Sequence, residues 1–228
     1  MSTHNDLLKA RFHLNMGRIN GLVKLIFSDF DPLKPTGPFQ SGGARADILR
    51  SIVVFLHATF EDVLRSHLPK PNKSLSFYSR TDLEKALKLS GIDAKPFRPL
   101  YPPLTQMAKR RKHIVHQADL SAHTAVVSEV WGVADDWQLI VWLMAVPAFY
   151  YQLRMSTGAA TVVERAMYGR LRAAMLIHVD FGKQLLALPT VPPELHIRLE
   201  ALRKIVVTLD SITAILKLDV SDFIVNQG

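Results

Sequence analysis

Hydrophobic residues recur at helical spacing over most of the chain. In residues 5 to 30 they share the three- and four-residue spacing of one helix face: Leu8, Phe12, Ile19, Leu22, Val23 and Ile26. Prolines and glycines in residues 31–46 then predict a loop. A second helix is predicted over residues 44–67. Its centre, residues 52–56, is apolar on every side, which is typical of a central, buried helix.

The middle of the chain alternates short polar segments with helical patterns. Residues 69–80 read as a polar loop, and Thr81 to Glu84 can cap a short helix that ends at Gly91. Residues 92–103 hold four prolines and lead into a third long helix. The apolar positions of that helix are Leu104, Met107, Ala108, Ile114, Val115 and Ala118. The basic residues of the segment before it are expected either to line a nucleic-acid groove or to be a solvated surface.

The last hundred residues also read as helical. After a loop to about residue 135, a helix is predicted through residue 153, kinked or stepped at Pro147. Its aromatic residues are expected in the core rather than as a base-stacking platform. Residues 161–188 form the next predicted helix. From residue 192 onward, leucines and valines alternate at spacings of four and three, which is a heptad seam that packs on its own domain or on a partner chain.

These patterns together predict an all-α fold, because no segment shows the two-residue alternation of a strand. A chain of 228 residues can bury a full core. The simplest organisation is one helical domain over residues 1–228, with residues 190–228 as a C-terminal helical extension.

Composition narrows the choice of partner and chemistry. The net charge of +8 favours a polyanion such as RNA. The chain has no cysteine, and its histidines lack metal-ligand spacing, so no metal site is predicted. It also lacks a phosphate-binding glycine loop and a serine nucleophile elbow, so no cofactor is predicted. The polar start and the short apolar runs favour a cytoplasmic protein without membrane contact.

The densest cluster of cations and imidazoles lies in the third long helix, in residues 109–119. Within it Arg111 falls on the apolar face, four residues after Met107 and three before Ile114. A guanidinium is not buried without a partner, so a carboxylate or phosphate should face it. Glu61, near the end of the central helix, is the first candidate for this partner of Arg111, and Asp62 is the second. The alternative is that these two carboxylates belong to a solvated last turn.

The sequence of this cluster, Arg-Arg-Lys-His-Ile-Val-His-Gln-Ala-Asp, resembles the signature of HEPN domains, all-helical proteins many of which are RNases. Their motif is an Arg, four to six residues, then a His, which matches Arg111 and His116. The branch called RiboL-PSP-HEPN reads roughly Arg-Arg-His-x-Ile-Val-His-x-Ala-Asp. This chain departs from it at Lys112. The resemblance implies a HEPN-like helical bundle, here with additional C-terminal helices, and a metal-independent endoribonuclease acting as a toxin or antiphage defence effector.

The chemistry of such a cut assigns roles to the cluster. When the RNA 2′-hydroxyl attacks the adjacent phosphorus, a base, an acid and positive charge near the phosphorane are needed. His116 suits the base or acid, and Arg111 suits the phosphate. The candidate catalytic residues are Arg111, His116, Glu61 and Arg110. The candidate substrate-binding residues are Lys109, Lys112, His113, Asp119 and Asp62.

Other interpretations of these residues stay open. For His113 a surface or core histidine is the preferred interpretation. His116 can be a buried histidine bonded to Asp119 or to a main-chain carbonyl. The chain as a whole can be a non-catalytic RNA-binding or scaffold module with a HEPN fold.

Helix geometry and the resemblance both favour a homodimer. Positions 111 and 116 lie about 140° apart on an ideal helix, so one pair should converge poorly. HEPN enzymes usually place two motifs across a composite cleft. An antitoxin or other regulatory partner is also expected. Some related toxins are controlled through a Tyr two residues after the His, but this chain has Ala118 there, which disfavours that control.

Overall fold

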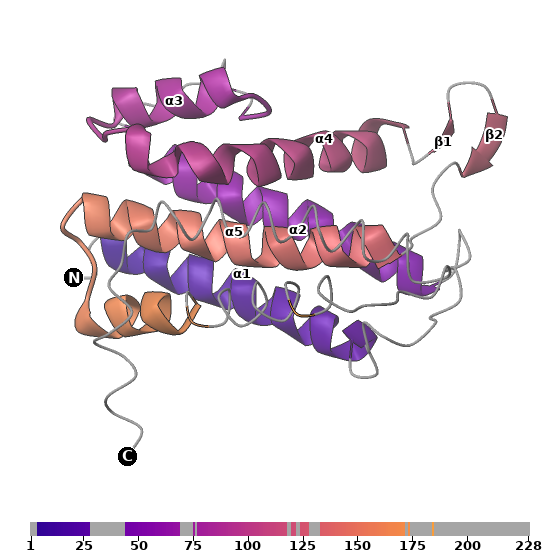
Figure 1. The fold of residues 1–228 in the computed structure, drawn as a ribbon, viewed down its shortest axis with the longest axis horizontal. Helices are drawn as coiled ribbons and strands as arrows, with labels where there is room; N and C mark the ends of the chain where they lie inside the picture. Colours follow the sequence, from indigo (N-terminus) through magenta and orange to yellow (C-terminus); the bar gives the residue numbers. More distant parts are fainter. Residues whose placement is uncertain are drawn as a thin grey trace.

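The structure is a computed structural model of the 228-residue chain. It describes residues 4–27, 44–68, 75, 77–117, 120–121, 124–127, 133–171, 173 and 184. The fold is all-α, as predicted, with elongated helices packed side by side (Figure 1). The predicted extension over residues 190–228, with its heptad seam, lies outside the described residues.

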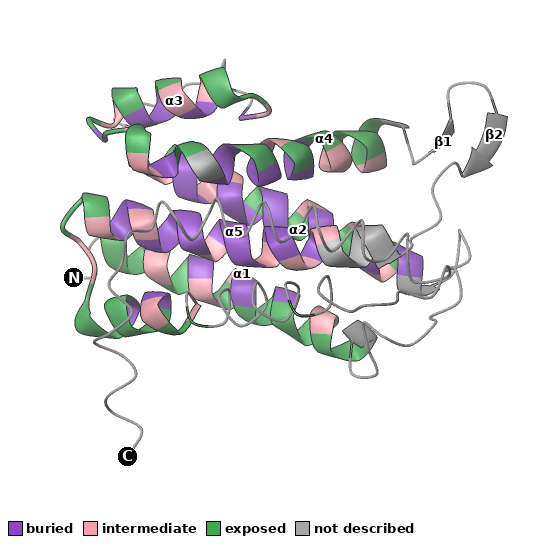
Figure 2. Ribbon diagram, in the orientation of Figure 1, coloured by how far each residue is buried: buried purple, intermediate pink, exposed green. Residues whose placement is uncertain are grey.

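Helix α2 (Ala44–His67) is the centre of the bundle. Three helices contact it: α1 (His4–Phe27), α4 (Tyr101–Gln117) and α5 (Val133–Ser156). Its bounds match the predicted helix. Ile52, Val53 and Leu56 are fully buried. Figure 2 shows that buried residues are concentrated along α2 and α5. The centre of the helix is not buried on every side, however, because Phe55 is about half exposed at 54%. An apolar face is buried only where a neighbouring element covers it, so the expectation of a buried centre was wrong at Phe55.

A short helix and a 3₁₀ helix lead into the motif helix. Helix α3 (Arg80–Leu89) begins at Ser79, whose hydroxyl accepts a hydrogen bond from the main-chain N–H of Asp82. The cap is therefore Ser79, not the predicted Thr81. The proline-rich segment that follows was predicted only to lead into the motif helix, and it forms the 3₁₀ helix η1 (Lys95–Leu100). It runs directly into α4 (Tyr101–Gln117).

After α4 the chain forms a small antiparallel hairpin of β1 (Leu120–Ser121) and β2 (Thr124–Val127). A loop was predicted for these residues, and that prediction was wrong. The second strand, Thr-Ala-Val-Val, is rich in β-branched residues, and these favour extended backbone. A strand of four residues is too short to be recognised from alternating apolar and polar positions.

Helix α5 (Val133–Ser156) continues through Pro147 and packs on both α2 and α4. Three of its aromatic residues lie in the core, as predicted: Trp142, Phe149 and Tyr150 are buried. The Tyr150 ring stacks on Phe12 of α1 with centroids 3.7 Å apart. None of the described helices combines the length and the apolar character needed to cross a bilayer.

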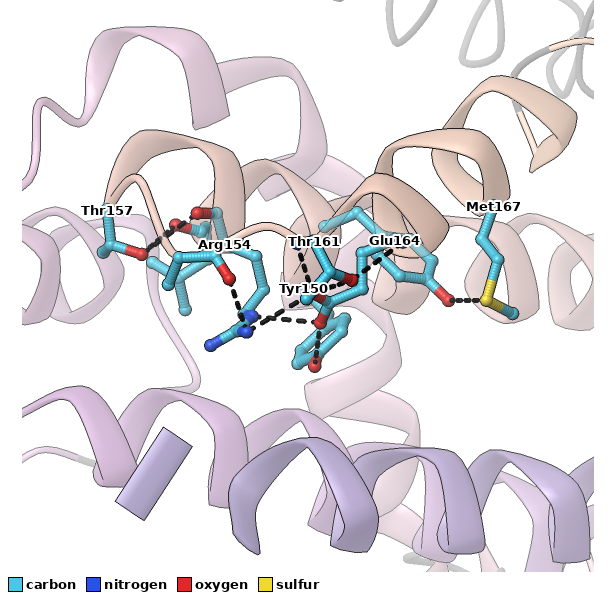
Figure 3. A network of polar contacts seen from close by, with 9 residues as sticks. Tyr150, Arg154, Thr157, Thr161, Glu164 and Met167 are labelled. Atoms are coloured by element: carbon cyan, nitrogen blue, oxygen red, sulfur yellow. Dashed lines mark hydrogen bonds and ion pairs between the residues drawn. The ribbon is translucent and has the colours of Figure 1, made fainter. Parts of the chain in front are cut away.

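A buried ion pair fixes the chain where it turns after α5 (Figure 3). Arg154 Nε lies 3.0 Å from Glu164 Oε1, and both side chains are at least 95% buried. Tyr150 also donates to this carboxylate. Thr161 and Glu164 form a capping box, since the Thr161 N–H donates to Glu164 Oε2 and the Glu164 N–H donates to Thr161 Oγ1. The box opens the next helix, residues 162–171.

Candidate functional site

The last two turns of α4 carry the cation cluster toward solvent. Lys109, Lys112, His113 and His116 are exposed, while Arg110 and Arg111 are half-buried. The preceding turns of the same helix are buried at Leu104, Met107 and Ala108. The helix therefore enters the core with its first turns and presents positive charge with its last ones. Asp119 lies outside the described residues.

Arg111 and His116 come together within one helix. Arg111 Nη1 lies 3.5 Å from His116 Nε2. The expectation that the pair would converge poorly was therefore wrong. The angle of about 140° applies to the Cα positions, but a long arginine side chain can carry its guanidinium around the helix surface to the imidazole.

Arg111 takes a phenol, not a carboxylate, as its short-range partner. Its Nη1 donates a hydrogen bond of 2.7 Å to the hydroxyl oxygen of Tyr78. Among the described residues no carboxylate forms an ion pair with Arg111. The prediction that Glu61 or Asp62 contacts Arg111 directly is wrong. Since the guanidinium is only half-buried, water can solvate the part that Tyr78 does not cover, and no buried counter-charge is required.

Glu61 and Asp62 have other partners. Glu61 Oε1 lies 2.7 Å from Arg65 Nη2, one turn along α2. Asp62 Oδ1 lies 3.1 Å from Arg11 Nη2 of α1, so it serves the α1–α2 contact instead of the cation cluster. Glu61 stays near the cluster only through His57, because its second carboxylate oxygen lies 3.9 Å from His57 Nδ1.

His57 is a buried residue that packs against Tyr78, the partner of Arg111. Its side chain is 1% exposed, and the Tyr78 ring stacks on it at 5.5 Å with an interplanar angle of 12°. Neither ring nitrogen has a hydrogen-bond partner among the described residues. Burial lowers the pKa of His57 to about 4, with Glu61 raising it and Arg111 lowering it further. His57 is therefore neutral at pH 7.

The low pKa of His57 predicts acid sensitivity of the fold. In the unfolded chain a histidine binds a proton near pH 6.5, but the folded protein resists protonation until about pH 4. The unfolded state then binds more protons between these values, so the free energy of unfolding falls as pH drops from 6.5 toward 4. We expect a loss of about 2 kcal/mol from this group between pH 7.5 and pH 4.5.

Urea unfolding of the wild type and of His57→Phe at the two pH values measures this term. Phenylalanine keeps a flat ring beneath Tyr78 and removes the titration. The variant should lose about 2 kcal/mol less than the wild type over the same interval. Equal pH dependence of both proteins would contradict a neutral, buried His57.

Sequence reasoning missed Tyr78 as a site residue, and it did not give His57 a role. Tyr78 lies in a segment read only as a polar loop, 33 residues before Arg111. His57 lies one turn before Glu61 on α2. A histidine in the middle of an apolar helix is the one signal that pointed to a special environment here.

Among the described residues, no group of three or more histidines, aspartates or glutamates lies close enough together to hold a metal ion. Comparison of the chain with protein-family models, with curated proteins and with solved structures found no match. The resemblance to HEPN proteins therefore rests on the residues around Arg111 and His116.

Proposed function

We propose that the protein is an endoribonuclease that cuts RNA through attack of the 2′-hydroxyl on the adjacent phosphorus. The observation that carries the proposal is the contact between Arg111 Nη1 and His116 Nε2, at 3.5 Å on an exposed helix face. An always-charged guanidinium beside an imidazole that is accessible to solvent places phosphate recognition next to proton transfer. The HEPN resemblance of the same residues supports this class of reaction.

In this reaction the 2′-oxygen forms a bond to phosphorus while the bond from phosphorus to the 5′-oxygen breaks. The 2′-proton passes to a base, and the leaving 5′-oxygen receives a proton from an acid. His116 takes one of these two roles, since imidazole exchanges protons near neutral pH. Arg111 stabilises the negative charge of the phosphorane. The products are a 2′,3′-cyclic phosphate and a free 5′-hydroxyl.

The surrounding charge fits an RNA substrate. Lys109, Lys112 and His113 are exposed on the same two turns of α4 as His116. They can contact phosphates on either side of the cut and contribute affinity without sequence preference. The net charge of +8 adds to the long-range attraction.

We further propose that the active form is a homodimer that acts in the cytoplasm as a toxin or antiphage effector, with an antitoxin or regulatory partner. The dimer was expected partly because Arg111 and His116 should converge poorly on one helix. Since the two residues are in contact within one chain, this reason no longer applies. A second copy is not needed to assemble the pair, but it would supply a second pair facing the first.

The mechanism predicts cleavage that survives a chelator. Purified protein should cut total RNA in EDTA and leave 2′,3′-cyclic phosphate ends, because the nucleophile belongs to the substrate. An oligonucleotide with a single 2′-deoxy sugar at the cut site should resist, with an all-ribose oligonucleotide of the same sequence as the control. Cleavage of the 2′-deoxy substrate, or strict dependence on Mg²⁺, would reject the mechanism. RNA binding with no cleavage at all would favour the RNA-binding module instead.

A further inference from the structure

We propose that Tyr78 is a positioning residue that holds the Arg111 guanidinium beside His116, an inference that rests on the proposed function. Arg111 Nη1 makes both contacts, at 2.7 Å to the Tyr78 hydroxyl and at 3.5 Å to His116 Nε2. One nitrogen therefore lies between the phenol and the imidazole. Without the short contact to Tyr78, a long side chain at a half-exposed position would sample many rotamers.

The ring of Tyr78 is itself fixed from below. It stacks on the buried His57 ring, 5.5 Å away and nearly parallel. Within the part of the chain that the structure describes, neither nitrogen of His57 forms a hydrogen bond, so the imidazole contributes its flat face to the stack. His57 belongs to α2, the central helix, so the position of the phenol is tied to the core of the bundle.

The backbone on the N-terminal side of Tyr78 is held by strong contacts. Phe77 is completely buried and has a φ of 55°, in the left-handed region that residues with side chains rarely adopt. The Arg65 guanidinium lies 4.8 Å from the centre of the Phe77 ring. Arg65 also donates to the carbonyl oxygen of Leu75, which is buried too. Strained backbone of this kind persists where surrounding contacts enforce it, and such positions gather at functional sites.

The backbone on the C-terminal side is held by the start of α3. Ser79 follows Tyr78 directly and is the N-cap of that helix. Its hydroxyl accepts from the Asp82 N–H at 3.1 Å. Tyr78 thus lies between a buried anchor and a helix cap, and its hydroxyl points to Arg111 from a rigid frame. A surface tyrosine without a role would not require this support.

Tyr78→Phe tests the inference, because it keeps the ring on His57 and removes only the oxygen that accepts from Arg111. We expect kcat for RNA cleavage to fall by about 10- to 100-fold, the range for a lost hydrogen bond to a charged group. The KM for RNA should change by less than kcat, because the exposed Lys109 and Lys112 still contribute affinity for other phosphates. The melting temperature should change little. Tyr101→Phe is the matched control, since it removes a buried hydroxyl that donates to the Ala94 carbonyl at the far end of α4. A kcat within twofold of wild type in Tyr78→Phe overturns the proposal.

Titration with inorganic phosphate keeps the test independent of cleavage. The imidazole resonance of His116, assigned by its absence in His116→Ala, should shift with phosphate in the wild type. Tyr78→Phe should raise the apparent Kd about tenfold, and Tyr101→Phe should not. If the wild type cuts no RNA, the proposed function fails and this titration alone decides the role of Tyr78. An unchanged Kd, or no phosphate-dependent shift in the wild type, overturns it.

Discussion

Replacing His116 with alanine is expected to lower kcat for RNA cleavage by about 10²- to 10⁴-fold, the usual contribution of a positioned general acid or base. The side chain is exposed and its contact is with Arg111, so its removal should not unfold the protein. RNA affinity should be retained, because the charges of Lys109, Arg110 and Lys112 remain. Cleavage rates with RNA in excess, together with a filter-binding isotherm, measure the two effects separately.

Two further variants separate chemistry from charge. His4→Ala removes another exposed histidine, on α1, and should leave kcat within twofold. Arg111→Lys keeps the charge but loses the planar fork that binds two phosphate oxygens. Its activity should therefore lie between that of the wild type and that of Arg111→Ala. Full activity in His116→Ala would exclude this histidine from the reaction and would remove the main support for a ribonuclease.

The same variants address the proposed homodimer. If each cleft draws residues from both chains, a mixture of inactive His116→Ala and inactive Arg111→Ala chains should recover some cleavage. The contact between the two residues in one chain reduces the need for such sharing. Light scattering at the working concentration provides the direct measurement. An active species with the mass of one chain would rule out the composite site.

The helices follow closely from local pattern. The predicted range of the central helix, 44–67, is that of α2, because caps and an apolar centre are local signals. The exposure of Phe55 was not predictable in the same way. Which faces of an apolar helix are covered depends on how many neighbours pack around it, and the sequence of one helix does not contain that number.

The site was predictable only up to the motif itself. The apolar stripe placed Arg111 at the edge of the core, and the structure finds it half-buried. Its partner was predicted on charge alone, which favoured Glu61. The observed partner, Tyr78, comes from a loop whose path depends on a left-handed residue at Phe77. Nothing in a hydrophobic pattern specifies a positive φ at a phenylalanine.

A second error had a different physical cause. The helical-wheel angle between Arg111 and His116 describes where Cβ atoms lie, and it ignores how far a side chain reaches. Short residues at this spacing would indeed stay apart. Arginine does not, and the 3.5 Å contact follows from its length.

The largest expected effect on stability concerns Glu164. Its carboxylate is 99% buried and receives hydrogen bonds from Tyr150, Arg154 and Thr161. Burial raises the pKa of Glu164, but the hydrogen bonds outweigh burial and hold it at about 2. Because Arg154 is buried as well, the loss of this charge leaves a cation without its counter-ion (Figure 3).

Glu164→Gln should therefore lower the free energy of unfolding by about 3 kcal/mol at pH 7, the low end for breaking a buried ion pair. Glu84→Gln breaks the exposed pairs with Arg80 and Arg98 and should cost less than about 1 kcal/mol. The double variant Arg154→Met with Glu164→Gln should lose less than the sum of its two single variants, because it no longer buries an unpaired charge.

Acid should reproduce the effect of Glu164→Gln. A carboxyl whose folded pKa is lowered stabilises the fold above its unfolded value, near 4.5, and this contribution disappears as pH falls toward 2. The wild type should thus lose more stability than Glu164→Gln between pH 4.5 and pH 2.5 in urea titrations. Parallel losses in the two proteins, or a Glu164→Gln variant as stable as Glu84→Gln, would show that this ion pair does not hold residues 162–171 onto α5.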